Sequence, residues 1–139
     1  MQGMSSIQNV QAGMSSMQNV QSGRLPLKES GRTVFVPLEQ VEYLEAYGNY
    51  VCVHAGAQRF LVREKLSAFC ERLQPHDFIR IHRSALINVA YVDEIQPCLT
   101  GEYLLRLTGG EEFTVSRTYK KNLSAIADSW VGTETFAAD

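Results

Sequence analysis

Closely spaced turn signals divide most of this chain into short segments, and this spacing constrains the fold more than any other feature. The pair Gly48-Asn49, typical of a two-residue hairpin turn, separates Val41–Tyr47 from Tyr50–His54. The turn Ala55–Gln58 follows at once. Strands joined so directly are antiparallel, because a parallel pair needs a long crossover connection. The sequence therefore predicts a mainly β fold with mostly antiparallel strands rather than βαβ units.

Further segments have the alternation or the β-branched and aromatic content of strands. They are Thr33–Leu38, Arg59–Val62, Phe78–His82, Ala90–Gln96, Tyr103–Leu107 and Glu112–Ser116. The count from the pattern is about seven to nine strands. In the Phe78–His82 segment, Ile79 and Ile81 are predicted to face the core, while Phe78, Arg80 and His82 share the polar face.

Apolar residues recur at helical spacing in two places. The first set predicts a short amphipathic helix that ends at Pro75, and comprises Leu66, Phe69, Cys70 and Leu73. The second set predicts a helix that Ser116 or Thr118 can cap, and comprises Leu123, Ile126, Ala127 and Trp130. The fold class expected from the residues is thus mainly β with two short α-helices.

The N-terminal segment differs in kind from the rest of the chain. Residues 1–23 contain an uncharged ten-residue unit that occurs twice, as Gly3–Ala12 and Gly13–Ser22. This composition is typical of a flexible leader or of a weak helix, and the segment is either a linker from an upstream domain or partly artificial. The predicted organisation is a leader at 1–23, one domain at 24–130 and a C-terminal tail at 131–139.

Composition excludes several classes of protein. No apolar run is long enough to span a membrane, and the N-terminus has no signal-peptide pattern. The cysteines Cys52, Cys70 and Cys98 form no CxxC pair, so each is interpreted as a small buried apolar residue of a cytoplasmic protein. The histidines lack metal-ligand spacing, and no catalytic arrangement stands out. We expect no enzyme activity, metal or cofactor.

Polar groups gather in the stretch "FIRIHRSALINVAYVDEI", Phe78–Ile95. If the strand ends near His82, then Arg83, Ser84 and Asn88 lie in or beside a loop. Guanidinium, imidazole, hydroxyl and amide groups are those that contact phosphates and base edges. The alternative is a solvated strand face followed by an ordinary turn.

Two other places carry similar chemistry. The segment Ser116–Asn122 is predicted to begin the last helix, where free backbone N–H groups suit phosphate. Lysines are unfavourable early in a helix, so Arg117, Lys120 and Lys121 indicate a binding site rather than a stabilising role; the alternative is a plain basic turn. In Tyr47–Tyr50, Asn49 and the tyrosines can contact a ligand, although taken alone a hairpin turn with packed tyrosines is the better interpretation.

The chain resembles the LytTR DNA-binding domain, the effector domain of many bacterial response regulators, over roughly Leu25 to Trp130. The resemblance is carried by three motifs in order: "VEYLEAYGNYVCVH", "FIRIHRSALIN" and "FTVSRTYKKNL". It implies about ten strands with short helices, and DNA binding through loops and a helix start rather than a recognition helix. It implies base contacts by Asn49, Arg83 and Arg117. The implied backbone contacts are Tyr50, His82, Ser84, Asn88, Tyr119, Lys120 and Lys121.

The function expected from this resemblance is sequence-specific binding of double-stranded DNA by a bacterial transcriptional regulator in the cytoplasm. In the family, two domains commonly bind adjacent direct repeats as a dimer, driven by an upstream receiver domain. Residues 1–23 are too short for such a domain and carry no acidic pocket. The chain is therefore interpreted either as the effector part of a regulator whose receiver or sensor domain lies outside it, or as a stand-alone regulator that is controlled in another way. The alternative from another class is a β-rich protein-interaction or ligand-sensing module that does not bind DNA.

Overall fold

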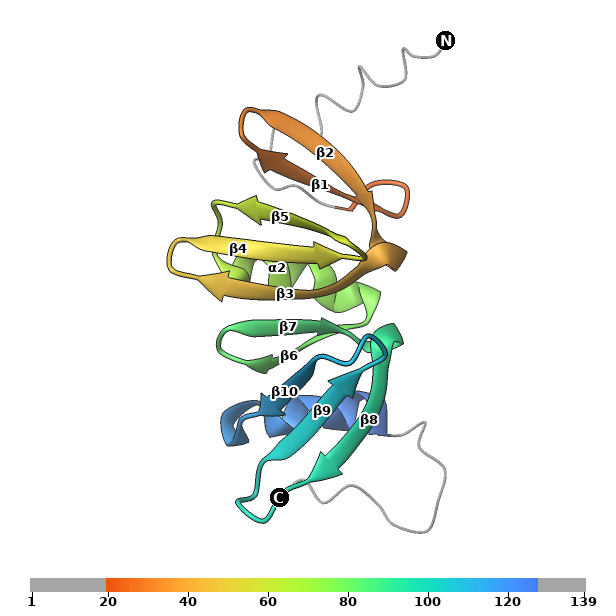
Figure 1. The fold of residues 1–139 in the computed structure, drawn as a ribbon, viewed down its shortest axis with the longest axis vertical. Coiled ribbons are helices and arrows are strands. Elements are labelled where there is room, and N and C mark those ends of the chain that lie inside the picture. The colour runs from red at the N-terminus through yellow and green to blue at the C-terminus, as the bar shows by residue number, and fades with distance from the viewer. Residues whose placement is uncertain (1–19, 128–139) are drawn as a thin grey trace.

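A computed structural model describes residues 20–127, and within them the chain forms ten strands, two α-helices and four 3-10 segments (Figure 1). The strands are β1 (Arg24–Glu29), β2 (Arg32–Pro37), β3 (Val41–Tyr47), β4 (Tyr50–Ala55), β5 (Gln58–Val62), β6 (Phe78–His82), β7 (Ala85–Asn88), β8 (Val92–Pro97), β9 (Tyr103–Leu107) and β10 (Glu112–Val115). The α-helices are α2 (Leu66–Leu73) and α3 (Ser124–Ala127), and the 3-10 segments are η1 (Leu38–Gln40), η2 (Gln74–His76), η3 (Val89–Tyr91) and η4 (Arg117–Leu123).

The strands form three antiparallel sheets stacked along the long axis of the molecule (Figure 1). Hairpin β1–β2 stands at one end, a five-stranded sheet of order β5-β4-β3-β7-β6 forms the middle, and a sheet of order β10-β9-β8 forms the other end. The β3–β4 register is set by a two-residue turn that pairs Tyr47 with Tyr50. Gly48 has φ +59°, which fits a type II′ turn with glycine first.

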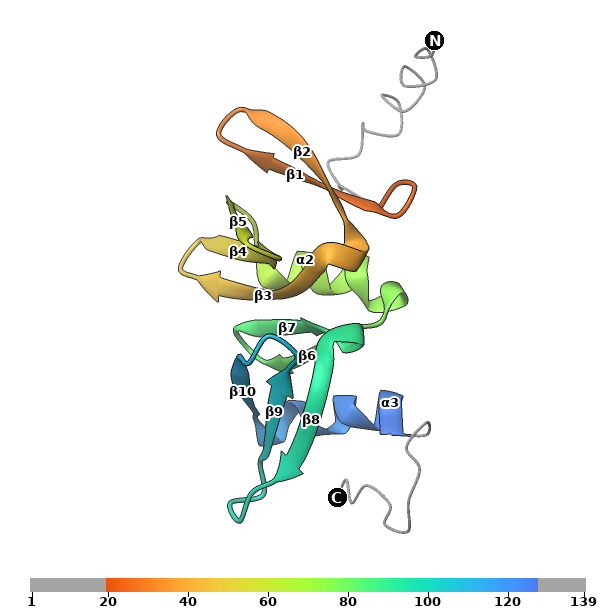
Figure 2. The ribbon, with the colours of Figure 1, turned by 45° about the vertical axis from the view of Figure 1, so that its right-hand side comes forward.

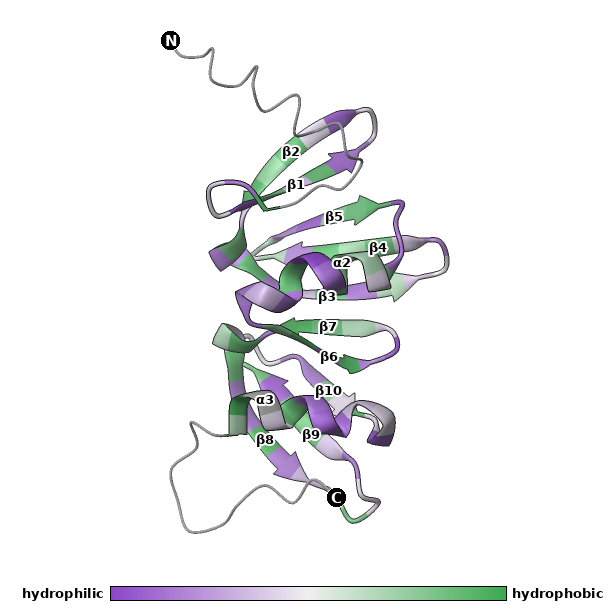
Figure 3. Ribbon diagram, turned by 180° about the vertical axis from the view of Figure 1, so that it is seen from behind, coloured by the Kyte–Doolittle hydropathy of each residue, from purple (hydrophilic) through white to green (hydrophobic). Residues whose placement is uncertain are grey.

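Two apolar clusters lie on opposite faces of the central sheet. One joins the β1–β2 hairpin, one sheet face and the buried stripe of α2, formed by Leu66, Phe69 and Leu73. The other joins the opposite sheet face to β9, β10 and η4 and includes Leu105, Val115 and Leu123. Figures 2 and 3 show α2 beside the middle sheet and α3 beside the end sheet. Strands β6 and β7 consequently bury both faces.

The mainly β architecture with antiparallel strands and two short helices is confirmed, but several details of the prediction were wrong. Strand β7 lies where a loop was expected after His82, and β1 was missed. Phe78 is only 2% exposed, because it packs into the first cluster while Ile79 and Ile81 pack into the second. Cys98 is exposed rather than buried, since it follows β8 in a turn.

The predicted second helix is also different in detail. The chain from Arg117 to Leu123 is 3-10, and α-helical geometry begins only at Ser124. Ser116 occupies the N-cap position, but its side chain makes no capping hydrogen bond. Trp130, the tail at 131–139 and most of the duplicated leader lie outside the described residues.

Candidate nucleic-acid interface

Three connections lie along one edge of the molecule, on the left in Figures 1 and 2. They are the β3–β4 turn with Gly48-Asn49, the β6–β7 turn with Arg83-Ser84, and the β10–η4 junction with Ser116-Arg117. We call these three connections the loop edge. The antiparallel order β4-β3-β7-β6 places the first two turns at the same end of the sheet, although they are far apart in the sequence.

Hydrogen bonds between the connections hold the loop edge together. The backbone N–H of Ala46, at the end of β3, donates to the carbonyl of Ser84 at 2.9 Å. Ser116 N–H donates to the carbonyl of Ile81 at 3.1 Å, which ties the β10–η4 junction to β6. The Asn122 side-chain amide donates to the carbonyl of Arg80 at 2.7 Å, so η4 also caps the open edge of β6.

The Arg80 side chain holds the β6–β7 turn through hydrogen bonds to its backbone carbonyls. Its Nε donates to the carbonyl of His82 at 3.2 Å, and its Nη2 donates to the carbonyl of Arg83. Its guanidinium carbon also lies 5.4 Å from the ring centroid of Tyr119, on η4. The planar guanidinium can serve both carbonyls and an aromatic face at once. Arg80 thus connects the turn that carries Arg83 with the segment that follows Arg117.

His82 and Ser84 form a local pair at the same turn. The Ser84 backbone N–H donates to His82 Nδ1 at 3.2 Å, and the Ser84 hydroxyl lies 2.9 Å from the same nitrogen. Because Nδ1 accepts the backbone proton, a neutral His82 carries its hydrogen on Nε2. The Nε2–H is then the donor that His82 can offer to a phosphate oxygen.

The expected DNA contact by Asn88 does not fit its position. Asn88 ends β7, at the opposite end of that strand from Arg83, and is only 5% exposed. Its Nδ2 donates to the carbonyl of Val41 at 2.8 Å, and its Oδ1 accepts from Ala90 N–H at 3.0 Å. The buried amide therefore joins β7 to β3 and η3, and we leave it out of the interface.

The basic residues of η4 differ from expectation in their setting. Arg117 and Lys121 are exposed, and Lys120 is half-buried with Nζ 6.0 Å from the Tyr103 ring centroid. Lys120 and Lys121 lie in the last turn of the 3-10 segment, which continues directly into α3, rather than in the first turn of an α-helix as predicted. The expected α-helix N-terminus is a 3-10 turn, and these side chains are cationic groups that can bind phosphate there.

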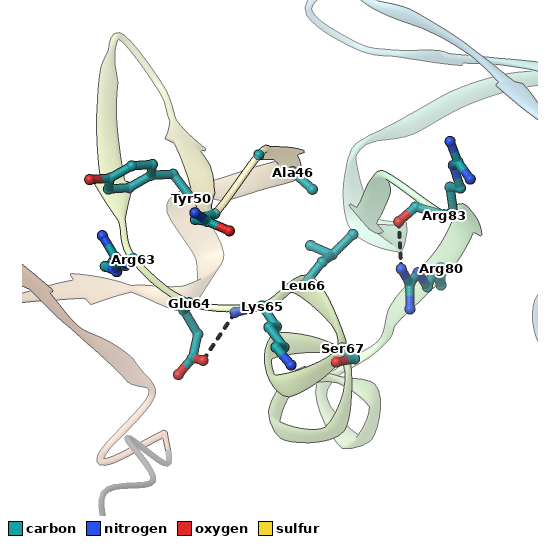
Figure 4. Close-up of a pocket in the computed structure, with 11 residues that line it drawn as sticks. Ala46, Tyr50, Arg63, Glu64, Lys65, Leu66, Ser67, Arg80 and Arg83 are labelled. Carbon is teal, nitrogen blue, oxygen red and sulfur yellow. Dashed lines mark hydrogen bonds between the residues drawn. The ribbon is translucent and has the colours of Figure 1, made fainter.

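The tyrosines of the β3–β4 turn are not packed as the simpler hypothesis required. Tyr47 is 55% exposed and Tyr50 is 39% exposed. The guanidinium of Arg63 lies 5.8 Å from the Tyr50 ring centroid. Arg63 and Lys65 border a groove beside this turn, shown in Figure 4. Neither residue stood out in the sequence, although both come directly before the predicted helix.

The connections of this mainly β domain thus present cations, an amide and tyrosines along one edge. The LytTr DNA-binding domain family model matches residues 31–128, and the chain belongs to this family. Within residues 20–127, no helix has the length and apolar character needed to cross a membrane.

Similar proteins include the sensory transduction protein LytT of Bacillus subtilis, 32% identical over 103 residues that cover 74% of this chain and 43% of that protein. The transcriptional regulatory protein YpdB of Escherichia coli is 29% identical over 101 residues, covering 72% of this chain and 41% of that protein. The chain thus spans about two fifths of the length of these relatives. A solved LytTr DNA-binding domain from a Bacillus cereus response regulator matches with a TM-score of 0.67 and 29% identity, covering 76% of this chain and 97% of the other.

Proposed function

We propose that this chain binds double-stranded DNA in a sequence-specific manner as part of a bacterial transcriptional regulator. The observation that carries the proposal is the loop edge, in which Asn49, Arg83 and Arg117 come from three separate connections held together by hydrogen bonds. Membership of the LytTr DNA-binding family supports DNA as the partner rather than another protein or a small ligand.

The three side chains have the groups that distinguish bases in the major groove. Arg83 and Arg117 are exposed and can each donate two hydrogen bonds to guanine O6 and N7. Asn49, also exposed, can pair with adenine N6 and N7. Each good bidentate pair contributes about 1–3 kcal/mol of discrimination against the wrong base.

The remaining polar groups of the loop edge are suited to phosphates, which fix register without reading sequence. This set comprises Tyr50, His82, Ser84, Tyr119, Lys120 and Lys121. His82 offers its Nε2–H, since Nδ1 is occupied by Ser84. Lys121 is exposed and contributes a salt-dependent charge.

The assembly that we propose places two such domains on adjacent direct repeats, with a receiver or sensor domain elsewhere in the full regulator. The support comes from the relatives, which are named as sensory transduction and transcriptional regulatory proteins and extend well beyond the matched segment. A chain with this role acts on chromosomal DNA in the bacterial cytoplasm.

The test is selection from a pool of random 30-base-pair duplexes, followed by salt titration on the enriched sequence. We expect a short repeat to be enriched and affinity to fall steeply with salt. Arg117→Ala should relax base preference at one position. Lys121→Ala should weaken binding to all sequences alike and reduce the salt slope by about 0.9. Binding without any enrichment, or identical effects of the two substitutions, would contradict the proposed division of roles.

A further inference from the structure

A groove of about 520 Å³ runs beside the loop edge, between the β3–β4 turn and the segment that joins β5 to α2 (Figure 4). We call it the β5–α2 groove. The residues that matter for its chemistry are Asn49, Tyr50, Arg63, Lys65, Arg80 and Arg83. Two of them, Asn49 and Arg83, are proposed base-reading residues, so the groove is continuous with the surface that faces DNA.

The groove is strongly cationic. Four basic side chains and one carboxylate line it, which gives a net charge of +3. The carboxylate, Glu64, accepts a hydrogen bond from Lys65 N–H at 3.0 Å and pairs with Arg72 at 3.3 Å. The first turn of α2 contains no acidic residue. The positive charge of the groove is therefore largely uncompensated by its own lining.

Arg63 and Lys65 supply the accessible part of this charge. Both residues are exposed, and within residues 20–127 neither side chain forms an ion pair. Arg80 contributes charge but directs its donors to the carbonyls of the β6–β7 turn, as Figure 4 shows for Arg83. The Tyr50 ring beside Arg63 favours a fixed guanidinium position through a cation–π contact.

We infer that the β5–α2 groove binds the phosphate backbone of the DNA that Asn49 and Arg83 read, through Arg63 and Lys65. The inference rests on the proposed function and extends the DNA footprint beyond the loop edge. An extended polyanion fits better than a peptide or an apolar ligand, because the groove is open, carries +3 and adjoins the base-reading residues. Contacts of this kind add affinity and register but no base preference.

The experiment compares Arg63→Gln, Lys65→Gln and the double variant with the matched control Arg59→Gln, on the duplex selected by the wild-type domain. Arg59 is exposed and lies near the other end of β5 from Arg63, so its substitution removes the same charge away from the groove. We expect the salt slope to fall by about 0.9 for each phosphate that is no longer neutralised, and the selected sequence to stay the same. Phosphate ethylation interference should show wild-type positions whose effect disappears in the double variant but persists in Arg59→Gln.

The outcomes separate this inference from the proposed function. If the wild-type domain selects no sequence, the proposed function fails and the inference fails with it. If the wild type selects a sequence but the double variant behaves like Arg59→Gln, only the groove inference is overturned. The groove inference is also overturned if the double variant changes the base preference. It is overturned as well if the domain binds ATP saturably and Arg63→Gln abolishes this binding while the DNA salt slope stays unchanged.

Discussion

The buried amide of Asn88 makes a sharp prediction, because the isosteric change Asn88→Asp removes its donor and keeps its shape. The introduced carboxylate can still accept a hydrogen bond from Ala90 N–H. When ionised, however, it has no hydrogen to donate to the Val41 carbonyl, which in the wild type accepts from the Asn88 amide at 2.8 Å. A buried group left without its partner costs about 1–3 kcal/mol, and burial of the charge adds to this. At pH 7 we expect a loss of at least about 2 kcal/mol of unfolding free energy, or roughly 10 °C in Tm.

The loss should depend on pH with a definite sign. Burial and the donation that a protonated carboxyl could make to Val41 both raise the pKa of the introduced carboxyl in the folded variant above its unfolded value. The difference in stability between wild type and variant is therefore largest above the raised pKa and shrinks as the pH falls toward about 4. Thermal unfolding of both proteins, followed by circular dichroism at several pH values, measures this difference.

Asn49→Asp is the matched control, because it is the same chemical change at an exposed turn. We expect its stability to stay within about 0.5 kcal/mol of the wild type while DNA affinity falls. Asn88→Asp should show the reverse at a temperature where it is folded, with unchanged base preference. A variant at Asn88 that is as stable as the wild type at pH 7 and that loses DNA binding would refute the structural role and restore the expectation of a DNA contact.

Two further predictions concern Arg80 and His54. Arg80→Met removes both hydrogen bonds to the β6–β7 turn and the contact with Tyr119. We expect roughly tenfold weaker DNA binding and faster amide exchange at Ser84. Arg80→Lys should restore neither the DNA affinity nor the slow exchange, because lysine lacks the planar guanidinium. Burial lowers the pKa of His54 below its ordinary 6.5, so the unfolded state takes up the proton first and the wild type loses stability as the pH falls below about 6.5. His54→Phe keeps an aromatic ring stacked on Tyr43, whose ring centroid lies 4.1 Å from that of His54 in the wild type. In urea unfolding between pH 5 and 8, this variant should lose less stability as the pH falls than the wild type does. If both proteins lose stability equally, His54 is not the source of the pH dependence.

The sequence predicted local structure well, but it did not reveal strands that are buried on both faces of the sheet. The β3–β4 hairpin followed from the turn signal Gly48-Asn49, and helix α2 followed from its apolar spacing. All four residues of strand β7 are buried, so the strand lacks the alternation of apolar and polar residues that marks a strand with one solvent-exposed face. In that apolar run Asn88 looked like a loop residue, whereas its partner, the Val41 carbonyl, lies 47 positions away in the chain.

The candidate site shows the same division. The residues at each connection could be selected from their chemistry and from the family resemblance, one connection at a time. Their assembly at one edge depends on the pairing of β7 with β3, two strands that are far apart in the sequence. It also depends on the hydrogen bond from Ser116 N–H to the Ile81 carbonyl. No local pattern encodes those pairings. For the same reason Arg63 and Lys65 were overlooked, because only the folded chain places them beside Asn49.

The hydrogen bonds that link the three connections have a consequence for how DNA preference can change over evolution. Loops ordered before binding lose little conformational entropy when the complex forms, so more of each base contact is expressed as affinity. The bonds that hold the loop edge use backbone groups and the Asn122 side chain, and none of the three side chains proposed to read bases. If Asn49, Arg83 and Arg117 read bases as proposed, their substitution can therefore alter the operator while the scaffold, and with it the spacing between the bases that are read, stays the same.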